Sequence, residues 1–189
     1  MSTMPWRGEL LSLDDWDAMP EEDSQRYELV EGSLQVAASP TASHQKAVAQ
    51  LLGQLLGQLP AEFDALFEMD VLFRGPLAPT VRKPDVVVVP SSVSDTLPAR
   101  FRAEDVVLAV EVVSPSTGKI DKVAKFSEYA DAGIPNYWII DLEPPASLSS
   151  YQLIETDYEL DQESAGTVEL VRPAALEIDL QALVTSRRP

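Results

Sequence analysis

The pattern of hydrophobic and polar positions along the chain predicts an α/β fold. Residues 43–59 repeat leucine and valine at helical spacing, which predicts a long amphipathic helix. Continuous apolar runs at 85–89 and 106–113 predict central strands that are covered on both faces. A second helix is expected over 119–132, followed by Gly133 as a left-handed cap. Because helices and strands alternate, we expect a central mixed β-sheet flanked by helices.

Weaker patterns predict further elements around this core. Ser12, followed after one residue by two aspartates, indicates the start of a short helix. Residues 27–36 indicate a hairpin whose turn is Glu31-Gly32, and residues 91–104 indicate a polar loop. The remaining strands are expected at 66–73, 136–141, 148–154, 157–161 and 167–171.

Length and composition fit one cytoplasmic domain. The chain has 189 residues, of which 45% are hydrophobic, and this is enough for one domain with its own core. We expect a single domain over 1–189, with its core at about 13–183 and a frayed tail at 185–189. No apolar run reaches the roughly 18 residues that span a bilayer, and the start of the chain lacks the pattern of a signal peptide. The absence of cysteine excludes disulfides and thiolate sites and fits a reducing cytoplasm.

The balance of charge argues against general attraction to nucleic acid. The net charge is −17, from 31 acidic and 14 basic side chains, which opposes the approach of a polyanion. Half of the basic side chains are nevertheless gathered between positions 82 and 125, at Arg82, Lys83, Arg100, Arg102, Lys119, Lys122 and Lys125. A basic patch could therefore survive on an acidic body, and a dimer could enlarge it.

Two carboxylates accompany the apolar runs and are the first candidates for chemistry. Asp85 begins one predicted strand and Glu111 lies inside another, where an unpaired charge is costly. Two carboxylates suit Mg²⁺, and the Val112 carbonyl could add a third oxygen ligand. A lysine from the following helix could orient a water and stabilise charge on a phosphoryl group. The plain alternative is structural, with Asp85 paired to Arg82 and Glu111 paired to a helix lysine.

Helical spacing leaves the choice of that lysine open. The apolar side of the helix over 119–132 is marked by Val123, Phe126 and Ala130. Lys125 shares a face with Asp121 almost opposite to this side, whereas Lys122 lies at its margin and could turn towards the sheet. Either lysine could also lie on a solvated face, as most lysines do.

Several other polar residues are weaker candidates. Glu31 could extend a metal site through water, or it could serve the hairpin turn alone. His44 is the only histidine and would lie in the first turn of the long helix, where it could approach a phosphate or simply pack. Residues 114–117, Ser-Pro-Ser-Thr, could bind phosphate at a helix start or could form an ordinary N-cap. No Gly-x-Ser-x-Gly elbow supports a serine hydrolase, and Tyr137 and Trp138 are expected in the core.

Taken in order, the chain's local patterns resemble a known family. The matching segments are Tyr27-Glu28-Leu-Val-Glu31-Gly32, Ser39-Pro40, His44-Gln45, Pro84-Asp85, Glu111-Val-Val-Ser114-Pro-Ser116-Thr117, Asp121-x-x-x-Lys125, Tyr129, Gly133 and Tyr137-Trp138-Ile-Ile-Asp141. Over about residues 13–183 the chain resembles the Uma-type "putative restriction endonuclease" family of the PD-(D/E)XK nuclease superfamily. The resemblance implies a restriction-endonuclease-like core.

The resemblance also implies a set of site residues. Asp85 and Glu111 would hold Mg²⁺ or Mn²⁺, and DNA would be the substrate. In the superfamily the lysine usually follows the glutamate by two residues, where this chain has Val113. The family pattern instead places this lysine on the following helix, at Lys125, with Lys122 kept as the alternative from periodicity.

The leading hypothesis is therefore a metal-dependent endonuclease that hydrolyses DNA phosphodiester bonds. Since one active site cuts one strand, a homodimer is expected for cutting two. An edge strand could supply its interface, as could the small-residue strip of Ala49, Gly53 and Gly57. The acidic charge favours an alternative of another class, a catalytically silent nuclease-fold module that binds nucleic acid or protein. A third possibility is a phosphodiester substrate that is not a nucleic acid.

Overall fold

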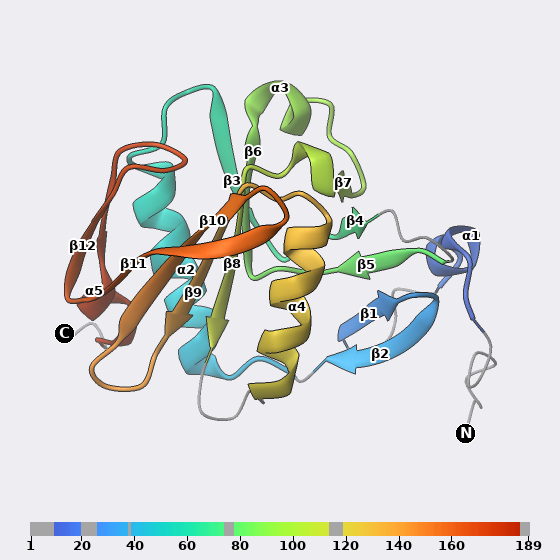
Figure 1. The fold of residues 1–189 in the computed structure, drawn as a ribbon, viewed down its shortest axis with the longest axis horizontal. Coiled ribbons are helices and arrows are strands. Elements are labelled where there is room, and N and C mark those ends of the chain that lie inside the picture. Colours follow the sequence, from blue (N-terminus) through green and yellow to red (C-terminus); the bar gives the residue numbers. More distant parts are fainter. Residues whose placement is uncertain (1–9, 20–25, 38, 74–77, 114–118, 186–189) are drawn as a thin grey trace.

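The structure is a computed structural model that describes residues 10–19, 26–37, 39–73, 78–113 and 119–185, with residues 119–123 described by their backbone alone (Figure 1). In chain order the elements are α1 (Leu13–Asp17), β1 (Arg26–Val30), β2 (Ser33–Ala37), α2 (Ala42–Leu56), β3 (Phe63–Phe67), β4 (Val71–Phe73), β5 (Thr80–Arg82), β6 (Val86–Pro90), α3 (Ser91–Ser94), β7 (Phe101–Arg102), a 3-10 helix (Ala103–Asp105), β8 (Leu108–Val113), α4 (Lys119–Asp131), β9 (Asn136–Asp141), β10 (Ser147–Ile154), β11 (Asp157–Ala165), β12 (Thr167–Leu170), β13 (Leu176–Asp179) and α5 (Leu180–Val184).

A six-stranded mixed sheet forms the centre of the molecule, and it confirms the predicted α/β class. Its strand order is β11-β10-β9-β8-β6-β3, and β8 and β9 are its parallel pair. Parallel neighbours need a crossover connection, which α4 provides between β8 and β9. The other neighbouring pairs are antiparallel.

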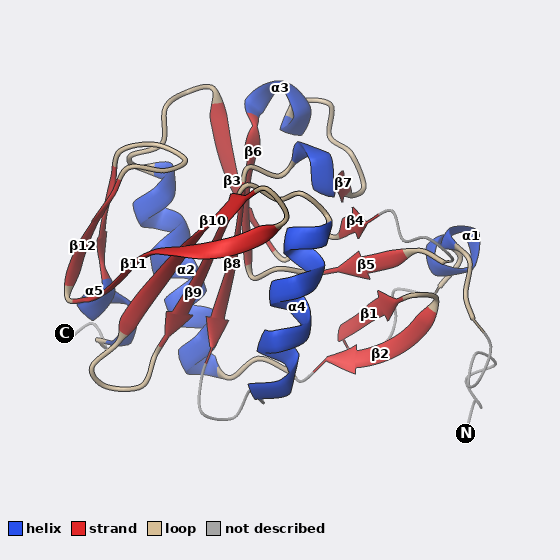
Figure 2. Cartoon of the chain, in the orientation of Figure 1, coloured by secondary structure: helices blue, strands red, loops and turns tan. Residues whose placement is uncertain are grey.

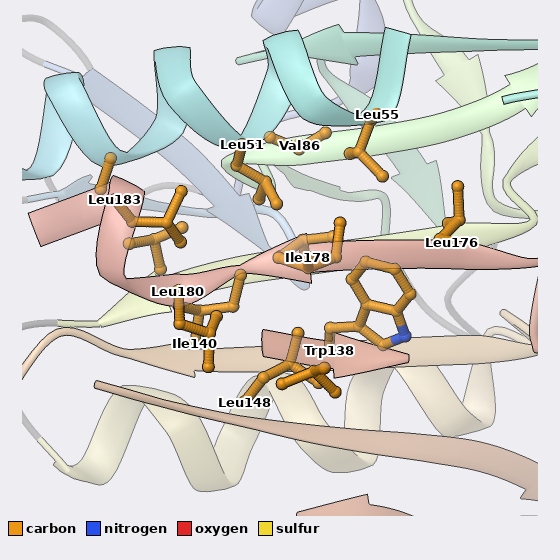
Figure 3. Close-up of a cluster of buried hydrophobic side chains, with 14 of the residues drawn as sticks. Leu51, Leu55, Val86, Trp138, Ile140, Leu148, Leu176, Ile178, Leu180 and Leu183 are labelled. Atoms are coloured by element: carbon orange, nitrogen blue, oxygen red, sulfur yellow. The ribbon is translucent and has the colours of Figure 1, made fainter. Parts of the chain in front are cut away.

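The two faces of this sheet are covered by different helices (Figure 2). Val86 and Val88 pack with α2, α5 and the small β12-β13 sheet, as Figure 3 shows for part of this cluster. Val87 and Val89 face the other way and pack with the side of α4 that carries Tyr129. Since alternate residues of a strand point to opposite faces, both faces of β6 are buried, which is why its sequence is continuously apolar.

A second sheet, which contains β1, lies beside the six-stranded sheet (Figure 1). Its order is β2-β1-β5-β4-β7. The hairpin of β1 and β2 turns at Glu31 and Gly32, as the sequence predicted. Both turn residues have positive φ. The φ of +79° at Gly133 confirms the predicted left-handed cap of α4. Ser12 caps α1 in the predicted way, with Asp15 completing a capping box.

Helix α2 matches its prediction but leaves the small-residue strip uncovered. It begins after Thr41, which is its N-cap, and runs over Ala42–Leu56 rather than 43–59. Ala49, Gly53 and Gly57 are exposed, and a Cβ placed on Gly53 would meet no described atom within 4 Å. Close packing within the described chain therefore does not explain these glycines.

Some predicted elements are wrong. The single strand expected at 66–73 is two strands, β3 and β4, in different sheets, separated at Glu68, whose φ is +52°. The polar loop expected at 91–104 contains α3, β7 and the start of the 3-10 helix, while β13 and α5 were not predicted. Of the predicted tail at 185–189, the last four residues lie outside the described ones. None of the helices in the described ranges is long and apolar enough to cross a membrane.

The core of α2 gives a first testable prediction. Leu51 is fully buried against the central sheet, whereas Leu56 on the same helix is 56% exposed. Leu51→Ala removes buried methyl groups and leaves a cavity, so it is expected to lower the free energy of unfolding by about 2–5 kcal/mol. Leu56→Ala, the matched control, is expected to change it by less than about 0.5 kcal/mol. Urea titration followed by circular dichroism measures both, and similar losses in the two variants would contradict this packing.

Candidate functional site

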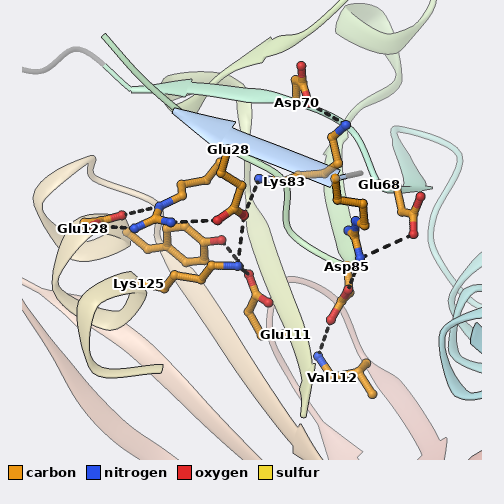
Figure 4. Close-up of polar contacts among 12 residues, drawn as sticks. Glu28, Glu68, Asp70, Lys83, Asp85, Glu111, Val112, Lys125 and Glu128 are labelled. Atoms are coloured by element: carbon orange, nitrogen blue, oxygen red, sulfur yellow. Dashed lines mark hydrogen bonds and ion pairs between the residues drawn. The ribbon is translucent and has the colours of Figure 1, made fainter. Parts of the chain in front are cut away.

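Asp85 directly precedes the first residue of β6, at the point where the neighbouring strand β8 continues beyond it. The β6–β8 ladder pairs Val86 with Val110, so the backbone of β8 beyond this point needs another partner. The Asp85 carboxylate supplies it, because Oδ2 accepts a hydrogen bond from the Val112 N–H at 2.8 Å (Figure 4). The same oxygen accepts a hydrogen bond from His44 Nε2 at 3.0 Å. Two donors therefore fix the orientation of a carboxylate that is only 5% exposed.

Glu111 projects from β8 towards α4. Its Oε1 lies 3.1 Å from Lys125 Nζ and accepts a hydrogen bond from the Tyr129 hydroxyl at 2.7 Å. Lys125 and Tyr129 are four residues apart and therefore share one face of α4. The structure thus brings Glu111 together with the lysine that the family resemblance indicated (Figure 4).

The alternative that places Lys125 on a solvated helix face is wrong. Its side chain is only 7% exposed, and the helix face that it shares with Tyr129 is buried as well. The reason is electrostatic, because two carboxylates neutralise the buried ammonium. The side chain of Lys122, the alternative, lies outside the described residues.

Glu28 is the site residue that the sequence reasoning missed. It is buried in β1, and its Oε1 lies 3.1 Å from Lys125 Nζ and accepts the Lys83 N–H. Its Oε2 accepts a hydrogen bond from Arg82 Nη1 at 2.7 Å. A charged residue between two buried apolar ones, Tyr27 and Leu29, is the same signal that identified Glu111. That signal was available in the sequence.

Arg82 extends this cluster and overturns part of the structural alternative. Its guanidinium binds both oxygens of Glu128, through Nε at 2.6 Å and Nη2 at 2.7 Å, as well as Glu28. The expected pair between Asp85 and Arg82 is therefore wrong. The pair between Glu111 and a helix lysine is present, as the structural alternative predicted.

The remaining candidates are distributed as follows. His44 joins Asp85, and among the described atoms its buried Nδ1 has no hydrogen-bond partner. Glu31 is exposed in the turn, and its N–H donates to Thr80 Oγ1, which agrees with a role in the turn. Residues 114–117 lie outside the described ranges. Tyr137 and Trp138 are buried in the core, as expected.

Burial and charge shift the pKa values of the site. Burial raises the pKa of Glu111 to about 7, and the charges of Asp85 and Glu28 add to this while Lys125 and Tyr129 oppose it. Burial alone would also raise the pKa of Glu28, but Lys125, Arg82 and the Lys83 N–H outweigh it and lower the value. The hydrogen bond to Asp85 raises the pKa of His44.

The oxygen donors fit a hard divalent cation. The described hydrogen bonds of Asp85 go to Oδ2 and those of Glu111 go to Oε1, so Oδ1 and Oε2 remain to bind a cation. In a strand the N–H and C=O of one residue point to the same side, so the Val112 carbonyl faces the side on which Asp85 lies. Within the described ranges no three His, Asp or Glu side chains form a metal-binding group. Mg²⁺ needs only one or two carboxylates, because it keeps several waters.

The described basic side chains of the segment are paired with carboxylates rather than left free as a patch. The described basic side chains between positions 82 and 125 all contact carboxylates; Lys83 pairs with Asp70 at 3.2 Å, and Arg102 pairs with Glu104 at 3.5 Å. Arg100 pairs with Asp17. The side chains of Lys119 and Lys122 lie outside the described ones. The positive charge that the sequence concentrates here is thus largely neutralised in the fold.

Comparisons with known proteins agree with this architecture. The family model described as "Uma2: Putative restriction endonuclease" matches residues 13–185. A crystal structure of a "putative nuclease belonging to DUF820" from Anabaena variabilis ATCC 29413 is similar, with a TM-score of 0.67 and 18% sequence identity. The match covers 92% of this chain and 97% of that one. At this identity the likeness shows the fold alone, and it confirms the predicted nuclease-like core. Comparison with curated proteins gives no match.

The raised pKa of Glu111 predicts a dependence of stability on pH. Between pH values of about 4.5 and about 7 the folded protein holds a proton at Glu111 that the unfolded chain has lost, so this group's contribution to stability falls as pH rises through that window. Glu111→Gln cannot ionise. Its Tm relative to the wild type is therefore expected to rise as the buffer is changed from about pH 5 to about pH 8.

The control for this prediction is Glu163→Gln, which removes an exposed carboxylate from β11. Its Tm difference from the wild type is expected to stay near zero at both pH values. Differential scanning calorimetry of the three proteins measures the effect. A Tm difference for Glu111→Gln that is the same at both pH values would contradict the burial of this charge.

Proposed function

Since the chain belongs to the Uma2 family, described as "Putative restriction endonuclease", we propose that it is a Mg²⁺- or Mn²⁺-dependent endonuclease that hydrolyses DNA phosphodiester bonds. The observation that carries the proposal is the contact between Lys125 and Glu111, beside Asp85 at the ends of two central strands. Asp85, Glu111 and the Val112 carbonyl are the proposed metal ligands, and Lys125 is the proposed catalytic lysine.

The protein holds the proposed ligands in place before any cation binds. The Val112 N–H and His44 fix one oxygen of Asp85, and Tyr129 and Lys125 fix one oxygen of Glu111. Such support reduces the reorganisation that binding would otherwise require. A bound divalent cation would polarise a phosphoryl oxygen and lower the pKa of a bound water.

Lys125 supplies a positive charge at a fixed position. Its ammonium lies 3.1 Å from Glu111 and 3.1 Å from Glu28, so carboxylates hold it from two sides. Placed there, it can donate a hydrogen bond to the attacking water and stabilise the charge that develops on the phosphoryl group. Glu28 acts through Lys125 by holding it, and Arg82 in turn holds Glu28.

We also propose that the enzyme acts in the cytoplasm and as a homodimer. One such site cuts one strand, so two copies account for cleavage of a duplex. The exposed strip of Ala49, Gly53 and Gly57 on α2 supports the idea of a close helix contact between copies, because small residues let backbones approach.

A second candidate function is a nuclease-fold module that binds nucleic acid or protein without turnover. The neutralised basic segment and the net charge of −17 favour it. Titration with Mn²⁺ by calorimetry separates the two functions. The endonuclease is expected to bind Mn²⁺ and to lose this binding in Glu111→Ala. The silent module does not need Mn²⁺ for its function, so the absence of Mn²⁺ binding would favour it.

The catalytic role of Lys125 predicts a specific loss of activity. Lys125→Met removes the ammonium while keeping most of the side chain's bulk, so nicking of supercoiled plasmid in Mn²⁺ is expected to fall roughly a hundredfold to a thousandfold. Mn²⁺ binding is expected to persist, because Asp85 and Glu111 remain. Agarose-gel time courses and calorimetry provide the two measurements.

Lys46→Met is the matched control, since Lys46 is an exposed lysine of α2. It is expected to cut at the wild-type rate. Equal nicking by Lys125→Met and the wild type would identify a contaminating nuclease and remove the support for this proposal. Loss of Mn²⁺ binding in Lys125→Met would show that the lysine organises the ligands rather than the water.

A further inference from the structure

Arg26 is a cation at the site that the mechanism has not used. It is the first residue of β1 and precedes Glu28 by two positions, so both side chains leave the same face of the strand. Glu28 reaches Lys125, while Arg26 reaches the other proposed site residue, Asp85. Arg26 Nη1 lies 4.0 Å from Asp85 Oδ1, the oxygen that the hydrogen bonds of Asp85 leave available.

The contacts of Arg26 differ in kind from those of the structural arginine, Arg82. Arg82 makes three hydrogen bonds of 2.6–2.7 Å, and its side chain is 2% exposed. Among the described residues, Arg26 makes two long ion pairs, 3.6 Å to Glu68 and 4.0 Å to Asp85, and both use the same nitrogen. Its side chain is 20% exposed. Most of its planar donor fork therefore remains available for an anion that comes from solvent.

Glu68 marks the position that such an anion would take. It follows β3 with a φ of +52°, a backbone conformation that is uncommon for glutamate, and its N–H donates to the Asp85 carbonyl at 3.3 Å. Its side chain is 39% exposed, and its carboxylate is the nearer of the two partners of Arg26. Glu68 is thus the more exposed of the two partners of Arg26, and it is the partner that a phosphate from solvent could displace.

From this geometry we infer that Arg26 binds a phosphate of the substrate beside Asp85, and that Glu68 holds the guanidinium until the phosphate displaces it. The inference rests on the proposed function, since it takes the anion to be a phosphodiester of DNA. Guanidinium groups bind phosphate through two parallel hydrogen bonds, which an ammonium cannot reproduce. Arg26 is therefore assigned to substrate binding, and Glu68 to competition with the substrate.

The test is equilibrium binding of a fluorescein-labelled DNA duplex, measured by anisotropy over a series of salt concentrations. It is run in EDTA and again in Ca²⁺. Arg26→Gln is expected to weaken binding roughly tenfold or more and to lower the slope of log K against log salt by about one. Arg26→Lys is expected to keep the slope and lose part of the affinity. Glu68→Gln is expected to bind several-fold more tightly, because the competing charge is gone.

Matched controls come from an exposed pair elsewhere. Arg102 and Glu104 form an ion pair with side chains 58% and 62% exposed. Arg102→Gln and Glu104→Gln change the net charge of the protein in the same way as the test variants. Both are expected to leave the affinity and the slope close to those of the wild type.

The outcomes separate this inference from the proposed function. Equal affinities and slopes for Arg26→Gln and Arg102→Gln would overturn the role of Arg26. Binding of DNA by Glu68→Gln that is no tighter than binding by Glu104→Gln would overturn it as well. So would a wild type that binds no DNA in either buffer. The Glu68 arm decides the question if Arg26→Gln does not fold. If the wild type binds DNA in the expected way but cuts none in Mn²⁺, the endonuclease proposal fails while the role of Arg26 stands. If the wild type cuts DNA and Arg26→Gln binds DNA normally, the role of Arg26 fails while the endonuclease proposal stands.

Discussion

The site depends on the burial of one ammonium group between two carboxylates. Lys125 comes from α4, Glu111 from the central sheet and Glu28 from the second sheet, so the three charges meet only where these elements pack together. Loss of one partner would leave a buried charge uncompensated, which costs several kcal/mol. The same ion pairs that make the burial tolerable also fix the ammonium 3.1 Å from a proposed metal ligand. The stability and the chemistry of this region therefore rest on the same contacts.

The charged groups around Lys125 carry more negative than positive charge. Among the described residues, four carboxylates, Glu28, Glu111, Glu128 and Asp85, stand against three permanent cations, Lys125, Arg82 and Arg26. Burial is the main reason that the pKa of Glu111 is raised, and the negative charges of Asp85 and Glu28 add to this effect. A divalent cation would relieve this excess, because it lowers the cost of keeping both proposed ligands ionised. The charges of the site thus favour a cation, although the described side chains form no metal-binding group of three.

Sequence reasoning found the residues whose signal is local and missed those whose meaning depends on packing. Asp85 and Glu111 stand out because the first begins an apolar run and the second interrupts one. Glu28 carries the same signal in a shorter strand, where the Glu31-Gly32 turn drew attention instead. The spacing of α4 left the choice between Lys125 and Lys122 open, because a helical pattern cannot show the carboxylates that arrive from two other strands. The family resemblance supplied what periodicity lacked.

The acidic surface narrows how such a site can meet its substrate. The described basic side chains of the 82–125 segment are engaged by carboxylates, and the net charge of −17 opposes long-range attraction of a polyanion such as the proposed DNA substrate. Attraction must then arise at short range, from groups at the site whose partners can be exchanged for phosphate. Arg26 meets this condition, because its ion pairs are longer than hydrogen bonds and one partner is exposed. Arg82 does not, because its hydrogen bonds are short and its side chain is buried. At the candidate site, the length and exposure of an ion pair, rather than the number of basic residues, therefore indicate which arginine can exchange its partner for an anion.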